Sequence, residues 1–104
     1  MGNDGNGVTG MAASYQPPHP GSLVKAEMES LGFSINAFAR KLDVSPATIH
    51  RLVTEKSAIS PEMAIRLSMT IGQSARLWMQ RQAEYDLWHV RQNGHVGKLP
   101  DLRA

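Results

Sequence analysis

Polar and basic side chains suited to contacts with a nucleic acid gather between Arg40 and Lys56. This segment holds four cations and two acids, and its excess of two positive charges equals the formal net charge of +2 of the whole 104-residue chain. Cationic side chains neutralise phosphates, and arginine also reads guanine in the major groove of DNA. The candidate contact residues are basic, polar or small, namely Arg40, Ser45, Ala47, Thr48, His50, Arg51, Thr54 and Lys56. Their types and spacing predict a DNA-binding surface.

The elements that must present these side chains are indicated by Pro46, which interrupts apolar residues at helical spacing. A proline in a helix interior costs about 3 kcal/mol, so the helix expected over residues 34–42 must end before it. Pro46 fits the first position of a second helix with Ser45 as N-cap, because no backbone N–H is needed there. Asp43 then lies in a tight turn, where left-handed backbone is expected. Two short helices joined in this way predict a helix-turn-helix.

Small and apolar residues predict how the two helices pack together. Ala39 is expected where they cross closely, and Val44, Ile49 and Leu52 are expected to face inward. The outward positions of the second helix are then Ala47, Thr48, His50, Arg51 and Thr54. A small and polar face of this kind suits the major groove, with Arg51 as the predicted base or phosphate contact. The backbone N–H groups that begin the second helix suit a phosphate.

Glycine, serine and proline divide the rest of the chain into short helical segments. Apolar residues at helical spacing predict five helices and no strand, so the expected fold is an all-α, five-helix bundle. Residues 1–18 are rich in Gly, Asn and Pro and predict a flexible N-terminal arm, in which Met11 is an alternative start. Residues 19–92 are the expected folded domain. Residues 93–104 carry Gly and Pro again and are expected to form a flexible tail.

Several function classes are disfavoured by what the sequence lacks. Without cysteine it has no disulfide, zinc–thiolate site or thiol nucleophile. No apolar stretch approaches the roughly 18 residues of a membrane span. The histidines lack the spacing of metal ligands, and no nucleophile elbow, phosphate-binding loop or carboxylate pair occurs. We therefore expect no catalytic residue, metal, cofactor or membrane partner. The lack of cysteine fits a reducing cytoplasm, which is the expected location, and fits any other compartment as well.

Several pieces of the chain carry a family pattern. They are His19-Pro20-Gly21, "SINAFARKLDVS" and "ATIHRL" across the two helices, "AIS" and "EMAIRL" after the loop, and "LWMQRQAEYDLW" near the end. Together they cover about 70 of the 104 residues. They resemble the HigA family of antitoxins, within the phage-repressor-like (XRE/Cro-type) helix-turn-helix class. The resemblance implies a homodimer that binds a palindromic operator, represses its own operon and neutralises a HigB/RelE-like toxin, an endoribonuclease that cleaves mRNA on the ribosome.

Three departures from the family pattern concern the loop and the last helix. Asp43 stands where the family usually has glycine, and Thr54-Glu55-Lys56 replaces an Asn-Gly-type loop. Leu77-Trp78 replaces a Phe-Trp pair. The first two departures bear on the phosphate contacts of the loop and not on the fold.

The last helix carries the candidate dimerisation residues Trp78, Tyr85, Leu87 and Trp88. These residues cannot all lie on one narrow stripe of a helix. The core is expected to take most of them, Trp78 first, and the spare aromatic surface suits a two-fold interface. A dimer would hold two recognition helices about 34 Å apart on one face of the DNA.

Two other functions stay open at this point. Some relatives act as stand-alone XRE-family transcriptional regulators without a toxin. The unusual loop also allows a protein-interaction module whose helix-turn-helix has lost its DNA contacts. Under that alternative, Arg51, His50 and Lys56 are solvated surface residues.

Overall fold

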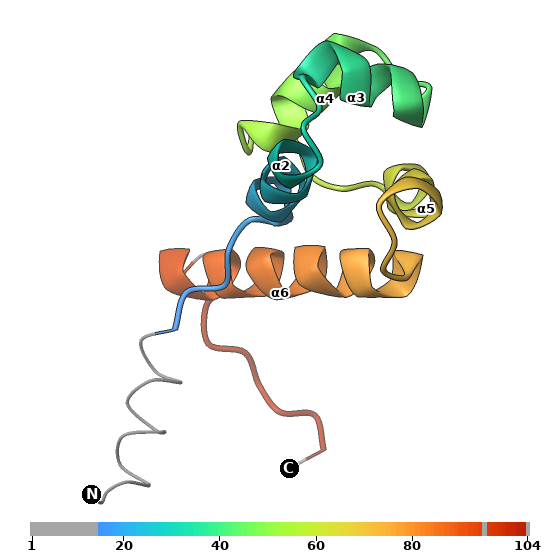
Figure 1. Ribbon diagram of the computed structural model, residues 1–104. Coiled ribbons are helices and arrows are strands. Elements are labelled where there is room, and N and C mark those ends of the chain that lie inside the picture. The colour runs from blue at the N-terminus through green and yellow to red at the C-terminus, as the bar shows by residue number, and fades with distance from the viewer. Residues whose placement is uncertain (1–14, 95, 104) are drawn as a thin grey trace, which may run out of the picture.

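A computed structural model describes residues 15–94 and 96–103 of the chain. Over these residues the chain forms five α-helices and no strand (Figure 1). They are α2 (Pro20–Ser30), α3 (Ile35–Leu42), α4 (Pro46–Val53), α5 (Pro61–Thr70) and α6 (Ala75–Asn93). The predicted all-α fold class is confirmed. None of these helices combines the length and the hydropathy needed to cross a membrane.

The two predicted ends of the chain are only partly covered by this description. Most of the expected N-terminal arm, residues 1–14 with the alternative start at Met11, lies outside the described residues. Of the following residues, Pro17 is buried and Tyr15 lies beside it against α6. At the other end α6 continues through Asn93, and the residues that follow it are exposed over 96–103.

Side-chain caps determine where the helices begin. The caps of α3, α4, α5 and α6 are serines whose Oγ accepts the backbone N–H three residues on, namely Ser34, Ser45, Ser60 and Ser74. Pro46 and Pro61 each follow one of these caps and occupy the first helical position. Pro46 therefore starts α4 and does not interrupt a longer helix, which confirms the break predicted from the sequence.

Left-handed residues close the first three helices. Gly32 (φ 80°) ends α2, and the N–H of Phe33 returns to the Met28 carbonyl at 3.0 Å. Asp43 (φ 59°) and Glu55 (φ 64°) follow α3 and α4 in the same conformation, although neither is glycine. A Cβ makes this conformation unfavourable, so the helix-turn-helix contains two positions that glycine would fit better.

The helices enclose one apolar core. Figure 1 shows α6 running along one side of the molecule, with α2 and α5 across it and with α3 and α4 beyond α2. The packed pairs are α3 with α4, α5 with α6, α2 with α4 and α6, and α3 with α5. The core side chains are Val24, Met28, Phe38, Ala39, Leu42, Ile49, Leu52, Val53, Ile59, Met63, Ala64, Leu67 and Trp78. Because α2 packs against both α4 and α6, it connects the helix-turn-helix with the last helix.

At Gly21 the backbone of α2 closely approaches the end of α4. Gly21 is buried, and a Cβ placed on it would overlap the carbonyl oxygen of Leu52. His19 caps α2 at the same place, because its Nδ1 accepts the N–H of Gly21 at 2.9 Å. Only glycine allows this approach, so Gly21 sets the distance between α2 and α4.

Candidate nucleic-acid interface

A tight turn between α3 and α4 sets the direction of α4. Asp43 adopts φ 59° and ψ 47°, and the N–H of Val44 donates to the Ala39 carbonyl at 3.0 Å. Ala39 itself is completely buried. The left-handed backbone predicted for Asp43 and the close packing predicted at Ala39 are both confirmed.

The inner side of α4 anchors this helix to the domain. Ile49 and Leu52 belong to the core, and Val44 is half-buried against it, so these residues face inward as predicted. Full burial of a side chain of this size stabilises the fold by about 1.5–3 kcal/mol. The inner side therefore decides which residues α4 presents to solvent.

The outer side of α4 is open to solvent. Ala47, His50, Arg51 and Thr54 are exposed, and Thr48 is half-buried. Over the described residues, the side chains of His50 and Arg51 have no hydrogen-bond or ion-pair partner. The predicted contact face is therefore free to meet a ligand, because none of residues 15–94 and 96–103 covers it.

The hydroxyl groups at the two ends of α4 have local partners. Ser45 Oγ accepts the N–H of Thr48 at 3.2 Å and lies 2.9 Å from Thr48 Oγ1. Thr54 Oγ1 donates to the His50 carbonyl at 2.6 Å. Each hydroxyl keeps lone pairs for a further bond, so these side chains can support the helix and contact a ligand at the same time.

A shallow groove lies beside the start of α4 and is formed by α3 and α4 together. Its volume is about 310 Å³, and it is lined by Asn36, Ala39, Arg40, Val44 and Pro46. Arg40 is exposed at this groove, and Lys56 is exposed in the loop that follows α4. The two cations therefore lie toward opposite ends of α4. The positive end of the α4 dipole adds to the charge of Arg40 where a phosphate would approach the groove.

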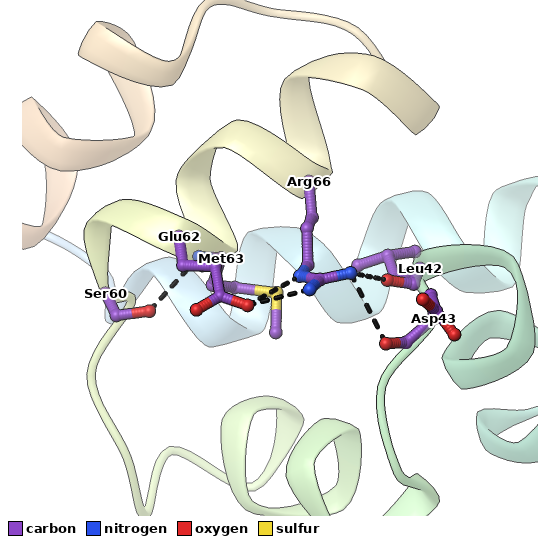
Figure 2. A network of polar contacts seen from close by, with 6 residues as sticks. All are labelled: Leu42, Asp43, Ser60, Glu62, Met63 and Arg66. Atoms are coloured by element: carbon purple, nitrogen blue, oxygen red, sulfur yellow. Dashed lines mark hydrogen bonds and ion pairs between the residues drawn. The ribbon is translucent and has the colours of Figure 1, made fainter.

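The sequence pattern does not single out Arg66, which holds the same turn from α5. Arg66 Nη1 donates to the carbonyl oxygens of Leu42 at 2.8 Å and Asp43 at 3.3 Å (Figure 2). Its Nε and Nη2 donate to Glu62 Oε2 at 3.1 and 2.7 Å. Carbonyls at a helix C-terminus lack helical partners, and Arg66 supplies one. In the sequence, Glu62 lies four residues before Arg66, a spacing that indicates an ion pair within α5. This spacing does not indicate the contact with the end of α3.

Two buried polar side chains also have roles that the sequence pattern does not indicate. His19, the cap of α2, meets the ring of Tyr85 edge-on with 4.9 Å between centroids. Gln82 Oε1 accepts the N–H of Ile59 at 2.8 Å and so ties the segment before α5 to α6. The signal for Gln82 was its place four residues after Trp78, on the stripe of α6 that faces the core.

The fold separates the candidate dimerisation residues. Trp78 is completely buried, as expected for the residue that the core takes first, because the first half of α6 packs against α5. Of the four candidate dimerisation residues, it is therefore the one that the fold withdraws from any interface. Tyr85 and Trp88 are half-buried, and Leu87 is 54% exposed. These three residues lie on the second half of α6, where the cover consists of α2 and residues 15–19.

A second groove, of about 370 Å³, lies along this half of α6. It is lined by Tyr15, Pro17, Glu84, Leu87, Trp88, Arg91 and Gln92. Its floor is apolar, and its lining includes an acid and a base, Glu84 and Arg91, which lie seven residues apart on α6. It shares no lining residue with the groove beside α4, so these two grooves are separate surfaces of different chemistry.

Residues 24–78, which contain α3, the turn and α4, match the Helix-turn-helix family. The chain belongs to this family. It is 37% identical over 85 residues to the uncharacterized HTH-type transcriptional regulator YddM of Escherichia coli (strain K12), which covers 82% of this chain and 90% of YddM.

Solved antitoxin structures are similar to this member of the helix-turn-helix family. Antitoxin GraA superposes with a TM-score of 0.75 at 31% identity, covering 83% of this chain and 100% of GraA. Pseudomonas aeruginosa antitoxin HigA, solved with the higBA promoter, superposes with a TM-score of 0.72 at 34% identity over 81% of this chain and 99% of HigA. The resemblance to HigA antitoxins that was noted in the sequence is confirmed.

Proposed function

We propose that the chain is the antitoxin of a type II toxin–antitoxin module and a repressor of its own operon. The observation that carries this proposal is the outer side of α4, which is small or polar and largely exposed, and on which the side chains of His50 and Arg51 have no partner within the described residues. A helix of this kind, held by a tight turn, is the element that enters the major groove in helix-turn-helix proteins. The promoter bound to the P. aeruginosa HigA structure supports the same role here.

The proposed contacts follow from the placement of each side chain. Arg51 reads a base or binds a phosphate at the centre of the exposed face, with Ala47, Thr48, His50 and Thr54 around it. Arg40 and Ser45 bind the phosphate backbone of the DNA near the start of α4. Lys56 binds the phosphate backbone beyond the C-terminal end of α4. Phosphate contacts at both ends would fix the register in which Arg51 meets the bases.

The proposed dimer forms along the second half of α6. An antiparallel two-fold arrangement places Leu87 and Trp88 near the axis and brings Glu84 of one copy beside Arg91 of the other. Such a contact buries the exposed part of Leu87 and pairs the charges at the edges of the groove. The dimer presents two copies of α4 to a palindromic operator.

The proposal also covers a protein partner and a location. The partner is a small HigB/RelE-like toxin that cleaves mRNA. DNA binding and dimerisation are assigned to residues 19–92. The chain acts in the cytoplasm, where its DNA and the ribosomes are, and it performs no catalysis itself.

Two linked measurements test the proposal. The chain is co-expressed with the reading frame beside its own gene and pulled down, and its binding to the DNA upstream of that gene is measured by gel shift. We expect both the neighbouring protein and the DNA to bind. DNA binding without capture of a protein would instead indicate a stand-alone regulator, the alternative that the relative YddM favours. Absence of both would leave only a protein-interaction module.

A further inference from the structure

We propose that Arg66 is a positioning residue for DNA binding. From α5 it holds the turn between α3 and α4 in the conformation that presents the outer side of α4 (Figure 2). The inference rests on the proposed DNA-binding function. It adds to that function a residue that lies outside the two helices of the helix-turn-helix.

The turn needs support because it contains an unfavourable backbone. Asp43 has φ 59°, and its carboxylate lies at the negative end of the α3 dipole. Over the described residues, neither the Leu42 carbonyl nor the Asp43 carbonyl accepts a backbone hydrogen bond in this turn. Arg66 Nη1 donates to both oxygens. The connection to α5 therefore stabilises a turn that the two short helices do not satisfy by themselves.

The guanidinium is held on its other side by Glu62. Nε and Nη2 of Arg66 both donate to one carboxylate oxygen, while Nη1 points to the turn (Figure 2). Three N–H groups in a rigid planar fork can serve these acceptors at once, which the single ammonium of lysine cannot do in the same geometry. The Glu62 side chain is 74% exposed, so its ion pair contributes little to stability and serves mainly to orient Arg66.

The conformation of this turn determines the direction of α4. Ser45, the cap of α4, lies two residues after Asp43, so a change in the turn changes the angle at which α4 leaves it. Without Arg66, the turn samples more conformations, and binding must order it before Arg51 can reach a base. That ordering lowers the affinity for DNA although no DNA contact has been removed.

Fluorescence anisotropy at several salt concentrations measures binding of the full chain to the DNA upstream of its gene. Arg66→Met should weaken binding about tenfold while the dependence on salt stays the same, because Arg66 contacts no phosphate. Adding Asp43→Gly should recover most of the loss, since glycine accepts the left-handed turn without support. Arg66→Lys should give an intermediate loss. Arg76→Met is the matched control, because Arg76 is exposed at the start of α6, and it should bind like the wild type.

Three results would overturn the inference. They are wild-type affinity of folded Arg66→Met, a double variant as weak as Arg66→Met, and a salt slope that falls by about 0.9 for each bound copy of the chain, which would make Arg66 a direct phosphate contact. Amide exchange of Val44 gives a readout that does not need DNA and is measured on Glu62→Gln as well, in case Arg66→Met does not fold. Faster exchange at Val44 with unchanged α6 amides supports the positioning role, and uniform exchange contradicts it. If wild-type protein does not bind this DNA, the proposed function fails, and the exchange at Val44 alone then decides whether Arg66 holds the turn.

Discussion

The outer side of α4 and the second half of α6 are both exposed helical surfaces, but their chemistry differs. On α4 the exposed groups are small, polar or cationic, with Arg51 near the middle. On α6 they include Leu87 at 54% exposure, the half-buried Trp88, and an acid and a base at the groove edges. DNA offers phosphates and hydrated base edges, whereas a second copy of this chain offers the same apolar side chains again.

This difference teaches that exposure alone does not define a binding surface. On the α4 face, phosphates and base edges can replace the water that hydrates the polar and cationic side chains, so this face suits DNA. Binding of this kind depends strongly on salt concentration. The α6 face gains most from removing apolar area from water, so it suits a protein. Since α2 packs against both helices, one element fixes the relative positions of the two surfaces.

The largest effect is expected from a substitution that disrupts the packing of α2 on α4, which connects the two surfaces. Gly21→Ala places a Cβ on the Leu52 carbonyl, and neither backbone can move without disturbing the core. We expect the free energy of unfolding to fall by about 3 kcal/mol, measured by urea denaturation.

The control for this substitution is Gly97→Ala. Gly97 has no atom near the position of an added Cβ and no positive φ, so its replacement should leave stability nearly unchanged. Equal stability of the two variants would show that α2 can withdraw from α4 freely.

The second prediction isolates the α6 surface. Leu87→Ser should raise the dissociation constant of the homodimer about 10²-fold, because burial of the exposed half of a leucine contributes about 1–1.5 kcal/mol and the two-fold axis repeats the loss. Analytical ultracentrifugation measures the change. Leu31→Ser is a matched control, since Leu31 is 53% exposed and Leu87 is 54% exposed. If both variants dissociate equally, or neither does, the dimer does not use this half of α6.

The third prediction isolates the α4 surface. Arg51→Ala should weaken binding to the upstream DNA by about 1–3 kcal/mol for each recognition helix and leave thermal unfolding unchanged. Arg76→Ala removes an equal charge from an exposed arginine at the start of α6 and should have little effect. Unchanged affinity of Arg51→Ala at all salt concentrations would remove Arg51 from the interface.

The smallest expected effects concern the left-handed residues that flank α4. Asp43→Gly and Glu55→Gly should each raise the free energy of unfolding by about 0.5–1 kcal/mol, because both residues have positive φ. Thermal denaturation measures the change. Ala26→Gly, within α2, should instead lower stability by about 1 kcal/mol. A loss of stability in Asp43→Gly would mean that the aspartate side chain supports the turn.

The elements of this protein were determined by the sequence itself, because the side-chain caps and backbone hydrogen bonds that begin and end them join residues at most five positions apart. Ser45 and Pro46 start α4, and Gly32 and Asp43 end the helices before them, as the residue types predict. The inward and outward sides of α4 also follow from spacing alone, since a helix repeats every 3.6 residues.

Only the tertiary structure decided which residues far apart in the sequence meet. Arg66 reaches carbonyls 23 and 24 residues away, and Gln82 reaches a backbone N–H 23 residues away. The same packing buries Trp78 and leaves Leu87 exposed, although both lie on α6. The angles and offsets between helices arise from the fit of all core side chains together, and no local pattern of residues encodes them.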